Sequence, residues 1–190
     1  ILTTSTVIGA TPTETSLNYS AATTLGGAST TFNGSGSSMG TSALSGNNIV
    51  LASTTGFAAG GGTFKIGSEL FTYTSVTNST TLAGVARAAE STTAADHADG
   101  IAVKFVIGTG DTMSGSGVIT VGSTTGFDSA GAIKIGNEFF TYTGTTSTTF
   151  TGVTRAVSST TAAQYDQTTA ITQALSPTAT TINVASTTGY

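Results

Sequence analysis

Charged side chains are scarce in this chain, and several other residue types are rare or missing. Only 7% of the 190 residues are charged, against roughly a quarter in a typical soluble domain. There are no cysteines, no tryptophans, two prolines and a single histidine. Without cysteine the chain has neither disulfide bonds nor thiolate metal sites. With one histidine, the usual pairs of nucleophile and base are nearly absent, which argues against an enzyme.

The few charges also restrict the partners. Five lysines and arginines against nine aspartates and glutamates give a net charge of −4, so no basic surface is available to bind nucleic acid. The longest apolar stretches, such as residues 101–107, are far shorter than the roughly 20 residues of a membrane-spanning helix. We therefore expect no nucleic-acid partner, no membrane partner and no cofactor.

The chain is instead rich in serine, threonine and glycine, arranged in an internal repeat. Serine and threonine make up about a third of the residues. Ser-Thr-Thr-Gly-Phe occurs at 53–57 and again at 123–127, and Lys-Ile-Gly-x-Glu occurs at 65–69 and at 134–138. The same order continues with Phe-Thr-Tyr-Thr, Gly-Val-x-Arg and Ser-Thr-Thr-Ala-Ala. The spacing between the copies falls from 70 to 68 positions, which predicts single-residue deletions in loops.

The repeat divides the chain into four segments. We expect a Ser/Thr/Gly-rich N-terminal arm over 1–46, a first β unit over 47–112 and a second β unit over 113–174. The last segment, 175–190, starts a third copy, because residues 182–190 match the beginning of the earlier two. Alternatively, this segment supplies a strand that pairs with another molecule.

Each copy contains the pattern of a tight β-hairpin. Gly67-Ser68, matched by Gly-Asn in the second copy, lies between two alternating apolar segments, as a two-residue turn requires. Pairing across this turn places Phe64 opposite Phe71. It also places Ile66 opposite Glu69, so one face of the hairpin is apolar and carries a glutamate.

The remaining strand candidates share one composition. They lie at 49–52, 81–87 and 101–106, with counterparts at 118–121, 149–155 and 169–173. Threonine suits such strands because its β-branched side chain fits a pleated, half-exposed surface without adding charge. We expect an all-β fold made of tandem small β-barrel or β-sandwich units of about 60 to 70 residues, with an extended N-terminal arm.

Glutamate and arginine recur at the same positions of both copies. Glu69 and Glu138 lie on the apolar face of the hairpin, where a carboxylate has to be paired or neutralised. Arg87 and Arg155 end a neighbouring strand candidate. We therefore expect two internal ion pairs, Glu69 with Arg87 and Glu138 with Arg155. A catalytic acid or base is the weaker interpretation, because the repeat explains both glutamates as one structural position used twice.

The single histidine raises the question of a metal site. His97 lies in the sequence Ala-Asp-His-Ala-Asp, which contains common metal ligands. The second copy has Tyr165 there, and a loop side chain that packs or hydrogen-bonds explains both residues. The glycine runs at 60–62 and 108–110 lack the lysine and the helix start of a phosphate-binding loop. We predict no metal site and no catalytic residue.

In this order the motifs resemble a module that recurs in virion structural proteins of tailed bacteriophages. In that family glycine often follows the arginine, and the last motif usually ends in Ala-x-His-x-x-Gly. The first copy keeps that ending at 95–100, whereas the second copy lacks the histidine and the glycine, and alanine follows both arginines. The resemblance covers about 48–172. It implies a fibre, tail or head-decoration protein and carries no enzymatic residue.

The resemblance and the composition predict a non-enzymatic bacteriophage virion structural protein that self-assembles as a homo-oligomer on the particle. Other virion proteins and a host surface are the further partners. Strand edges without charge favour pairing with a neighbouring strand. The C-terminal strand candidate fits donation to such an edge: Thr181, Ile182, Asn183, Val184 and Ala185. The Ser/Thr-rich arm before residue 47 fits the same use.

Two other interpretations stay open. A subunit of a bacterial or archaeal extracellular filament or surface layer, joined by strand donation, fits the composition equally well and would place the chain outside the cell or at its surface. A carbohydrate-binding adhesin would need clustered exposed aromatic side chains. There is no tryptophan, and most phenylalanines and tyrosines fall on the predicted core face, so sugar binding is the weaker of the two.

Overall fold

Strands, turns and loops make up the described part of the chain. The computed structural model describes residues 21–26, 30–111 and 113–174. Within these ranges the strand pairings are antiparallel, and the helical segments are two short 3-10 turns, η2 (Ser45–Asn47) and η3 (Ala89–Ser91). The predicted all-β class is therefore confirmed. No helix in the described ranges is long and apolar enough to span a membrane.

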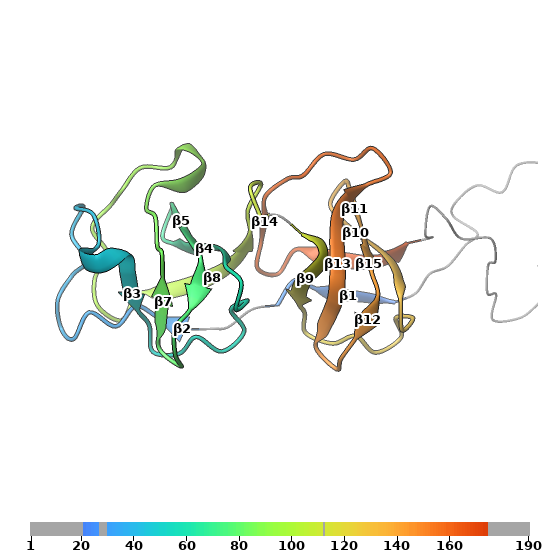
Figure 1. Cartoon of the computed structure of the whole chain (residues 1–190), viewed down its shortest axis with the longest axis horizontal. Helices are drawn as coiled ribbons and strands as arrows, with labels where there is room; N and C mark the ends of the chain where they lie inside the picture. Colours follow the sequence, from blue (N-terminus) through green and yellow to red (C-terminus); the bar gives the residue numbers. More distant parts are fainter. Residues whose placement is uncertain (1–20, 27–29, 112, 175–190) are drawn as a thin grey trace, which may run out of the picture.

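The strands gather into two lobes that lie side by side along the long axis of the molecule (Figure 1). The first lobe contains β2 (Thr30–Thr31), β3 (Asn48–Val50), β4 (Gly62–Ile66), β5 (Glu69–Tyr73), β6 (Ser75–Val76), β7 (Thr81–Ala83) and β8 (Ala102–Ile107). The second lobe contains β1 (Ala22–Thr24), β9 (Ser114–Thr120), β10 (Gly131–Ile135), β11 (Glu138–Tyr142), β12 (Gly144–Thr145), β13 (Thr149–Val157), β14 (Tyr165–Asp166) and β15 (Ala170–Ala174).

The two hairpins form in the register that the sequence predicts. In β4 and β5, Phe64 pairs with Phe71, and Glu69 lies opposite Ile66 next to the turn. The second hairpin, β10 with β11, repeats this register around Gly136. Gly67 and Gly136 have φ angles of +58° and +55°, a conformation that glycine adopts without steric cost at the first central position of a tight turn.

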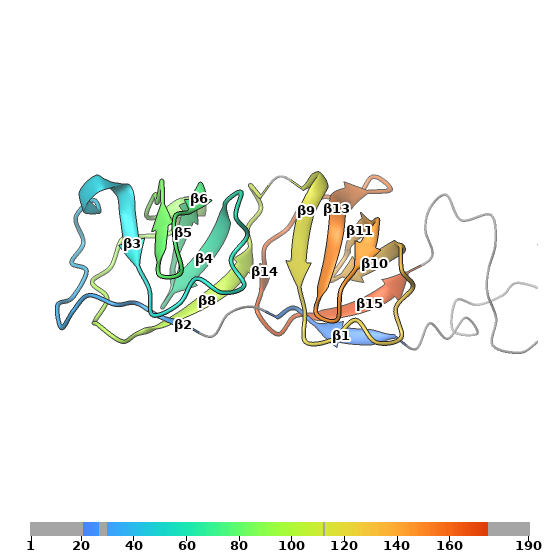
Figure 2. The same ribbon diagram turned by 60° about the horizontal axis from the view of Figure 1, so that its bottom comes forward.

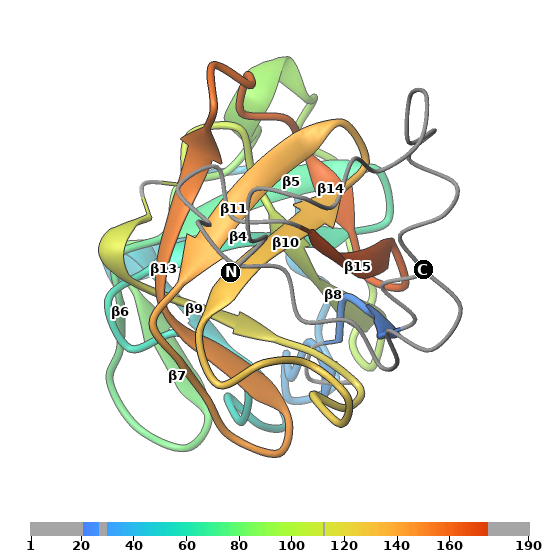
Figure 3. The same cartoon turned by 90° about the vertical axis from the view of Figure 1, so that its right-hand side faces the viewer.

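Both lobes are rings of paired strands around an apolar interior. In the second lobe β1, β15, β10, β11 and β13 pair in that order, and β13 also pairs with β9. A bridge between Leu25 and Val121 joins the end of β1 to the end of β9. In the first lobe β2, β8, β4 and β5 pair in order, and the matching bridge joins Phe32 to Leu51. Seen end-on, the strands wrap around the interior (Figure 3).

The N-terminal region differs from the arm expected over 1–46. Of its described residues, β1 pairs with β15 in the second lobe and β2 pairs with β8 in the first. Figure 2 shows the two strands one after the other along the same side of the molecule. Leu25 and Phe32 follow these strands and are buried in the two cores. Burial of these apolar side chains explains why this part of the chain belongs to the fold.

The boundary between the lobes is a shared strand and not a linker. Val103, at the start of β8, lies in the core of the first lobe, whereas Phe105 and Ile107 lie in the core of the second. The end of β8 also pairs with β14, through Ile107 opposite Tyr165. Neither lobe is therefore complete within the boundaries expected at 47–112 and 113–174. The expected third copy, 175–190, lies outside the described residues.

Candidate functional site

The glutamate on the apolar face of each hairpin forms an ion pair with the arginine that the sequence predicts. Arg87 binds Glu69 through two parallel hydrogen bonds, from Nε to Oε1 at 2.9 Å and from Nη2 to Oε2 at 2.8 Å. Arg155 binds Glu138 in the same way, with both distances at 2.9 Å. Both glutamates are 0% exposed. Two parallel bonds between a guanidinium and a carboxylate are the strong form of this ion pair.

Three further donors complete the contacts of the Glu69 carboxylate. The backbone N–H groups of Ala88 and Ala95 donate to it at 3.1 and 3.0 Å. His97 lies with Nε2 at 2.8 Å from Oε2, and because an ionised carboxylate only accepts hydrogen bonds, Nε2 is the donor. The His97 ring also packs beside Phe71, with the ring centres 5.8 Å apart.

The second lobe repeats this arrangement, with Tyr165 in place of His97. The backbone N–H groups of Ala156 and Ala163 donate to Glu138 at 3.0 Å. Tyr165 stands beside Glu138 where the first lobe has His97, and its ring packs against Phe140 with the ring centres 6.3 Å apart. Burial raises the pKa of Tyr165, and the charge of the neighbouring Glu138 raises it further. Histidine and tyrosine therefore take the same place in the two lobes, each with its ring against the phenylalanine of the hairpin.

The arginines donate their remaining N–H groups to backbone carbonyls. Arg87 donates to Gly40, Ser42 and Ala95, and Arg155 donates to Gly108, Asp111 and Ala163. A guanidinium has five N–H donors, and both arginines use all five. Each Glu–Arg network (the glutamate, its arginine and the groups bonded to them) therefore joins the hairpin to the segment that precedes the repeat copy and to the loop that follows the arginine.

The Glu69 network keeps the carboxylate ionised. Burial by itself raises the pKa of Glu69, but the hydrogen bonds from Arg87, Ala95, His97 and Ala88 together outweigh it and lower the pKa from 4.5 to about 2. A carboxylate with a pKa this low is a weak base. With its oxygens occupied and no exposed surface, it also offers no position for a substrate. The network therefore supports a structural role.

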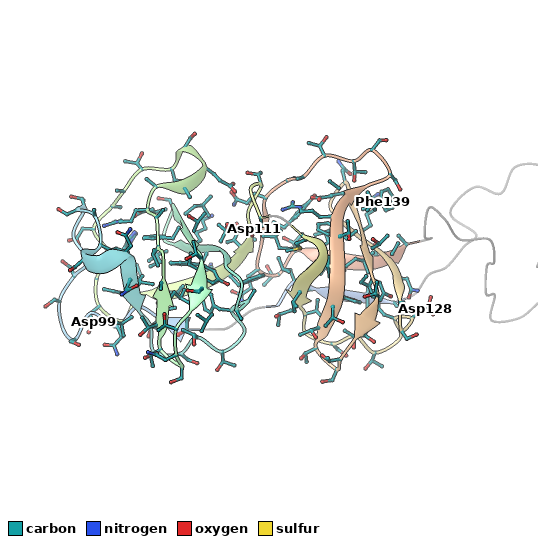
Figure 4. The ribbon with its side chains drawn as sticks, in the orientation of Figure 1. Asp99, Asp111, Asp128 and Phe139 are labelled. Carbon is teal, nitrogen blue, oxygen red and sulfur yellow. The ribbon has the colours of Figure 1, made fainter. Side chains whose placement is uncertain are left out.

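The acids beside His97 accept hydrogen bonds from the backbone of the preceding segment. Asp99 accepts the backbone N–H groups of Gly34 and Gly36 at 2.6 and 2.9 Å, and Asp96 accepts that of Gly40 at 2.8 Å. Figure 4 shows Asp99 at the edge of the first lobe, away from the junction. No group of three or more possible metal-ligating side chains occurs among the described residues.

The alanine that follows each arginine has a left-handed backbone conformation. Ala88 and Ala156 have φ angles of +53° and +54°, which places their N–H groups on the glutamate oxygens. The left-handed region costs a residue with a Cβ roughly 1–2 kcal/mol.

Beside the shared strand β8, the two lobes also meet through a small polar junction. Thr63 of the first lobe donates from Oγ1 to Asp111 at 2.7 Å, and the N–H of Gly108 donates to the same carboxylate at 2.8 Å. Lys65 of the first lobe contacts Asp166 of the second at 3.3 Å. Asp111 lies between the lobes in Figure 4. Burial raises the pKa of Asp111 above its ordinary value, although these hydrogen bonds oppose the shift.

A wide groove of about 820 Å³ opens beside this junction. Its lining includes Gly60 to Gly62, Phe57, Tyr73, Glu90 and Asp111. Two acidic residues in the lining do not suit a phosphate. The strand candidate at 181–185 lies outside the described residues, so its predicted use in strand donation stays a prediction.

Removing one partner of the buried ion pair should be costly. Glu138→Ala leaves Arg155 without its counter-charge and should lower the free energy of unfolding by about 3 to 5 kcal/mol. Lys65→Ala, at a partly exposed ion pair, should cost less than about 1 kcal/mol. Urea denaturation measures both values. Equal values for the two variants would contradict the structural role of Glu138.

Acid should destabilise the folded protein by protonating Glu69. The folded state lowers the pKa from 4.5 to about 2, so between these values the unfolded state binds more protons. The stabilisation is complete above about pH 4.5 and is lost as the pH falls towards 2. Urea midpoints measured down this range should fall, and Glu69→Gln, which does not titrate, should flatten the slope. An unchanged slope in this variant would show that other groups cause the acid response.

Glycine at position 88, directly after Arg87, should make the folded protein more stable than alanine does. Ala88→Gly removes the Cβ from a left-handed position and should raise the free energy of unfolding by about 1 kcal/mol. The control is Ala86→Gly two residues earlier, where φ is not positive and glycine should destabilise by about 0.5 to 1 kcal/mol. Thermal unfolding reports both signs, and destabilisation by Ala88→Gly would contradict the backbone conformation described.

Comparisons with known proteins found no relative of this chain. No protein-family model, no curated protein and no solved structure matches the chain. The two Glu–Arg networks and the junction between the lobes are therefore the features on which a functional argument depends.

Proposed function

We propose that this chain is a non-enzymatic structural protein of a bacteriophage virion, which self-assembles on the head or tail of the particle. The observation that carries the proposal is that the residues shared by the two repeat copies hold the lobes together in both. A module whose shared residues serve the scaffold fits a building block better than a catalyst.

The shared glutamates and arginines form the two buried networks, and the other shared motifs also have matching structural roles. In the Ser-Thr-Thr motif, Thr55 and Thr125 each donate a backbone N–H to the preceding serine hydroxyl at 3.1 Å. In the Phe-Thr-Tyr-Thr motif, the tyrosine hydroxyls donate to backbone carbonyls at 3.1 and 3.0 Å. In the last motif, Thr92 and Thr160 accept a backbone N–H from the hairpin.

The glycine of the Gly-Val-x-Arg motif has the same kind of role. Gly84 and Gly152 have φ angles of +63° and +61°, and a Cβ added at either would lie 2.0 or 1.9 Å from a threonine hydroxyl. No side chain larger than hydrogen fits there. Packing and hydrogen bonding thus account for these motif residues in both copies, which supports a structural role.

The surface also supports a role in assembly. No charged residue occurs between Glu14 and Lys65, so charge repulsion between neighbouring copies is weak over this part of the chain. Among the described residues, the large apolar side chains that are exposed are Val50 and Val118. They do not form an aromatic platform for a sugar ring. These features favour contacts between strands and backbones over recognition of a carbohydrate.

Immunogold electron microscopy of the native source tests the proposal. Gold on the heads or tails of phage particles is the expected result, and its position distinguishes decoration from fibre. Gold along cell-attached filaments or on the cell envelope would overturn the virion assignment in favour of the extracellular filament or surface layer. Labelling with pre-immune antibody is the control.

Self-assembly has a separate test in solution. Light scattering of the purified chain should show a mass that rises above that of the monomer as the concentration increases. Sodium chloride should have little effect on this mass, because the chain carries few charges to screen. A strictly monomeric chain at high concentration would contradict the assembly proposal.

A further inference from the structure

The ring of strands in the second lobe is closed by a segment that is very distant in sequence. Thr23 of β1 pairs with Ile171 of β15, and Leu25 bridges Val121 at the end of β9. Leu25 is 1% exposed and belongs to the core of this lobe. Without β1, both β15 and the end of β9 would present unpaired backbone groups, and the core would be open. We call this position between β15 and β9 the strand slot.

The first lobe has an equivalent slot, filled by the next part of the same segment. Thr30 of β2 pairs with Val103 of β8, and Phe32 bridges Leu51. Thr-Thr-Leu at 23–25 and Thr-Thr-Phe at 30–32 are seven positions apart. The two strands therefore present the same residue types to the two slots.

The hydrogen bonds of the two slots also match. The hydroxyls of Thr23 and Thr30 accept backbone N–H groups from Ser123 and Ser53, at 3.3 and 2.9 Å. The residue after the buried Leu25 or Phe32 donates its N–H to a strand carbonyl, at 2.9 Å in both lobes. Each slot thus recognises a short uncharged strand of the form Thr-Thr-apolar by its backbone and one buried side chain.

We propose that the strand slot of the second lobe accepts β1 from a second copy of this chain, which links the copies by strand exchange. The contacts in the slot would be those seen within one chain, so β1 keeps its native partners after the exchange, which is favoured where many copies are held close together. The absence of charge from β1, β9 and β15 leaves nothing that would repel a strand from another copy. This inference rests on the self-assembly part of the proposed function and names its contact.

Thr24 and Ala170 give a direct way to detect the exchange. They face each other in the pairing of β1 with β15, and both are exposed. Backbone hydrogen bonds at Leu25–Thr169 and Ala21–Gln173 show that this pair lies at a position without backbone hydrogen bonds, where side chains approach closely enough for a disulfide. Because the chain has no cysteine, introduced cysteines have no competing partner.

The experiment uses two full-length chains, one with Thr24→Cys and one with Ala170→Cys. The chains are mixed in denaturant, refolded together, oxidised and separated by non-reducing electrophoresis. A disulfide-linked heterodimer is the expected result. The matched control mixes Thr24→Cys with Ser79→Cys, an exposed position in a turn of the first lobe, and should give far less heterodimer. A chain carrying both Thr24→Cys and Ala170→Cys, refolded alone at high dilution so that copies rarely meet, should close an internal disulfide, which checks that the cysteines leave the fold intact.

The outcomes separate this inference from the proposed self-assembly. Heterodimer above the control supports strand exchange. Heterodimer no higher than the control, in chains that light scattering shows to be oligomeric, overturns strand exchange and leaves self-assembly through another surface. No heterodimer in chains that stay monomeric overturns both.

Discussion

A carboxylate buried in an apolar interior is the constraint on which each lobe depends. Leaving such a charge unpaired costs several kcal/mol, so the lobe is complete only when an arginine and two backbone N–H groups reach Glu69 or its counterpart together. These groups come from separate parts of the chain. Closing the hairpin, ordering the loop after the arginine and docking the preceding segment are therefore one cooperative event.

The parts of this design that are local or repeated were predictable from the sequence. The hairpin register follows from a two-residue turn between alternating apolar residues, and the structure has that register in both copies. The Glu–Arg pairs follow from one physical rule, that a charge on an apolar face needs a partner. Two copies at nearly constant spacing made both inferences stronger, because a structural position recurs whereas a catalytic group need not.

The parts that depend on distant contacts were not predictable in the same way. Strands β1 and β2 are two or three residues long and rich in threonine, so their periodicity is too short to identify them; the spacing of Thr-Thr-Leu and Thr-Thr-Phe was the available signal. Leu70 lies on the face of the hairpin opposite to Glu69 and Phe71, yet it is 2% exposed, because the loop around η3 packs against β5 and Thr92 binds the N–H of Leu70. The role of His97 became clear only from the folded loop.

The attachment of one segment to both lobes also has a mechanical consequence. Strand β1 lies antiparallel to β15, and β2 lies antiparallel to β8. Tension along this segment acts parallel to the strands, so it loads the backbone hydrogen bonds of a strand pair in shear and all at once. Leu25 must leave the core of the second lobe in the same step. The segment therefore resists a pull along its own direction better than it resists peeling from one end.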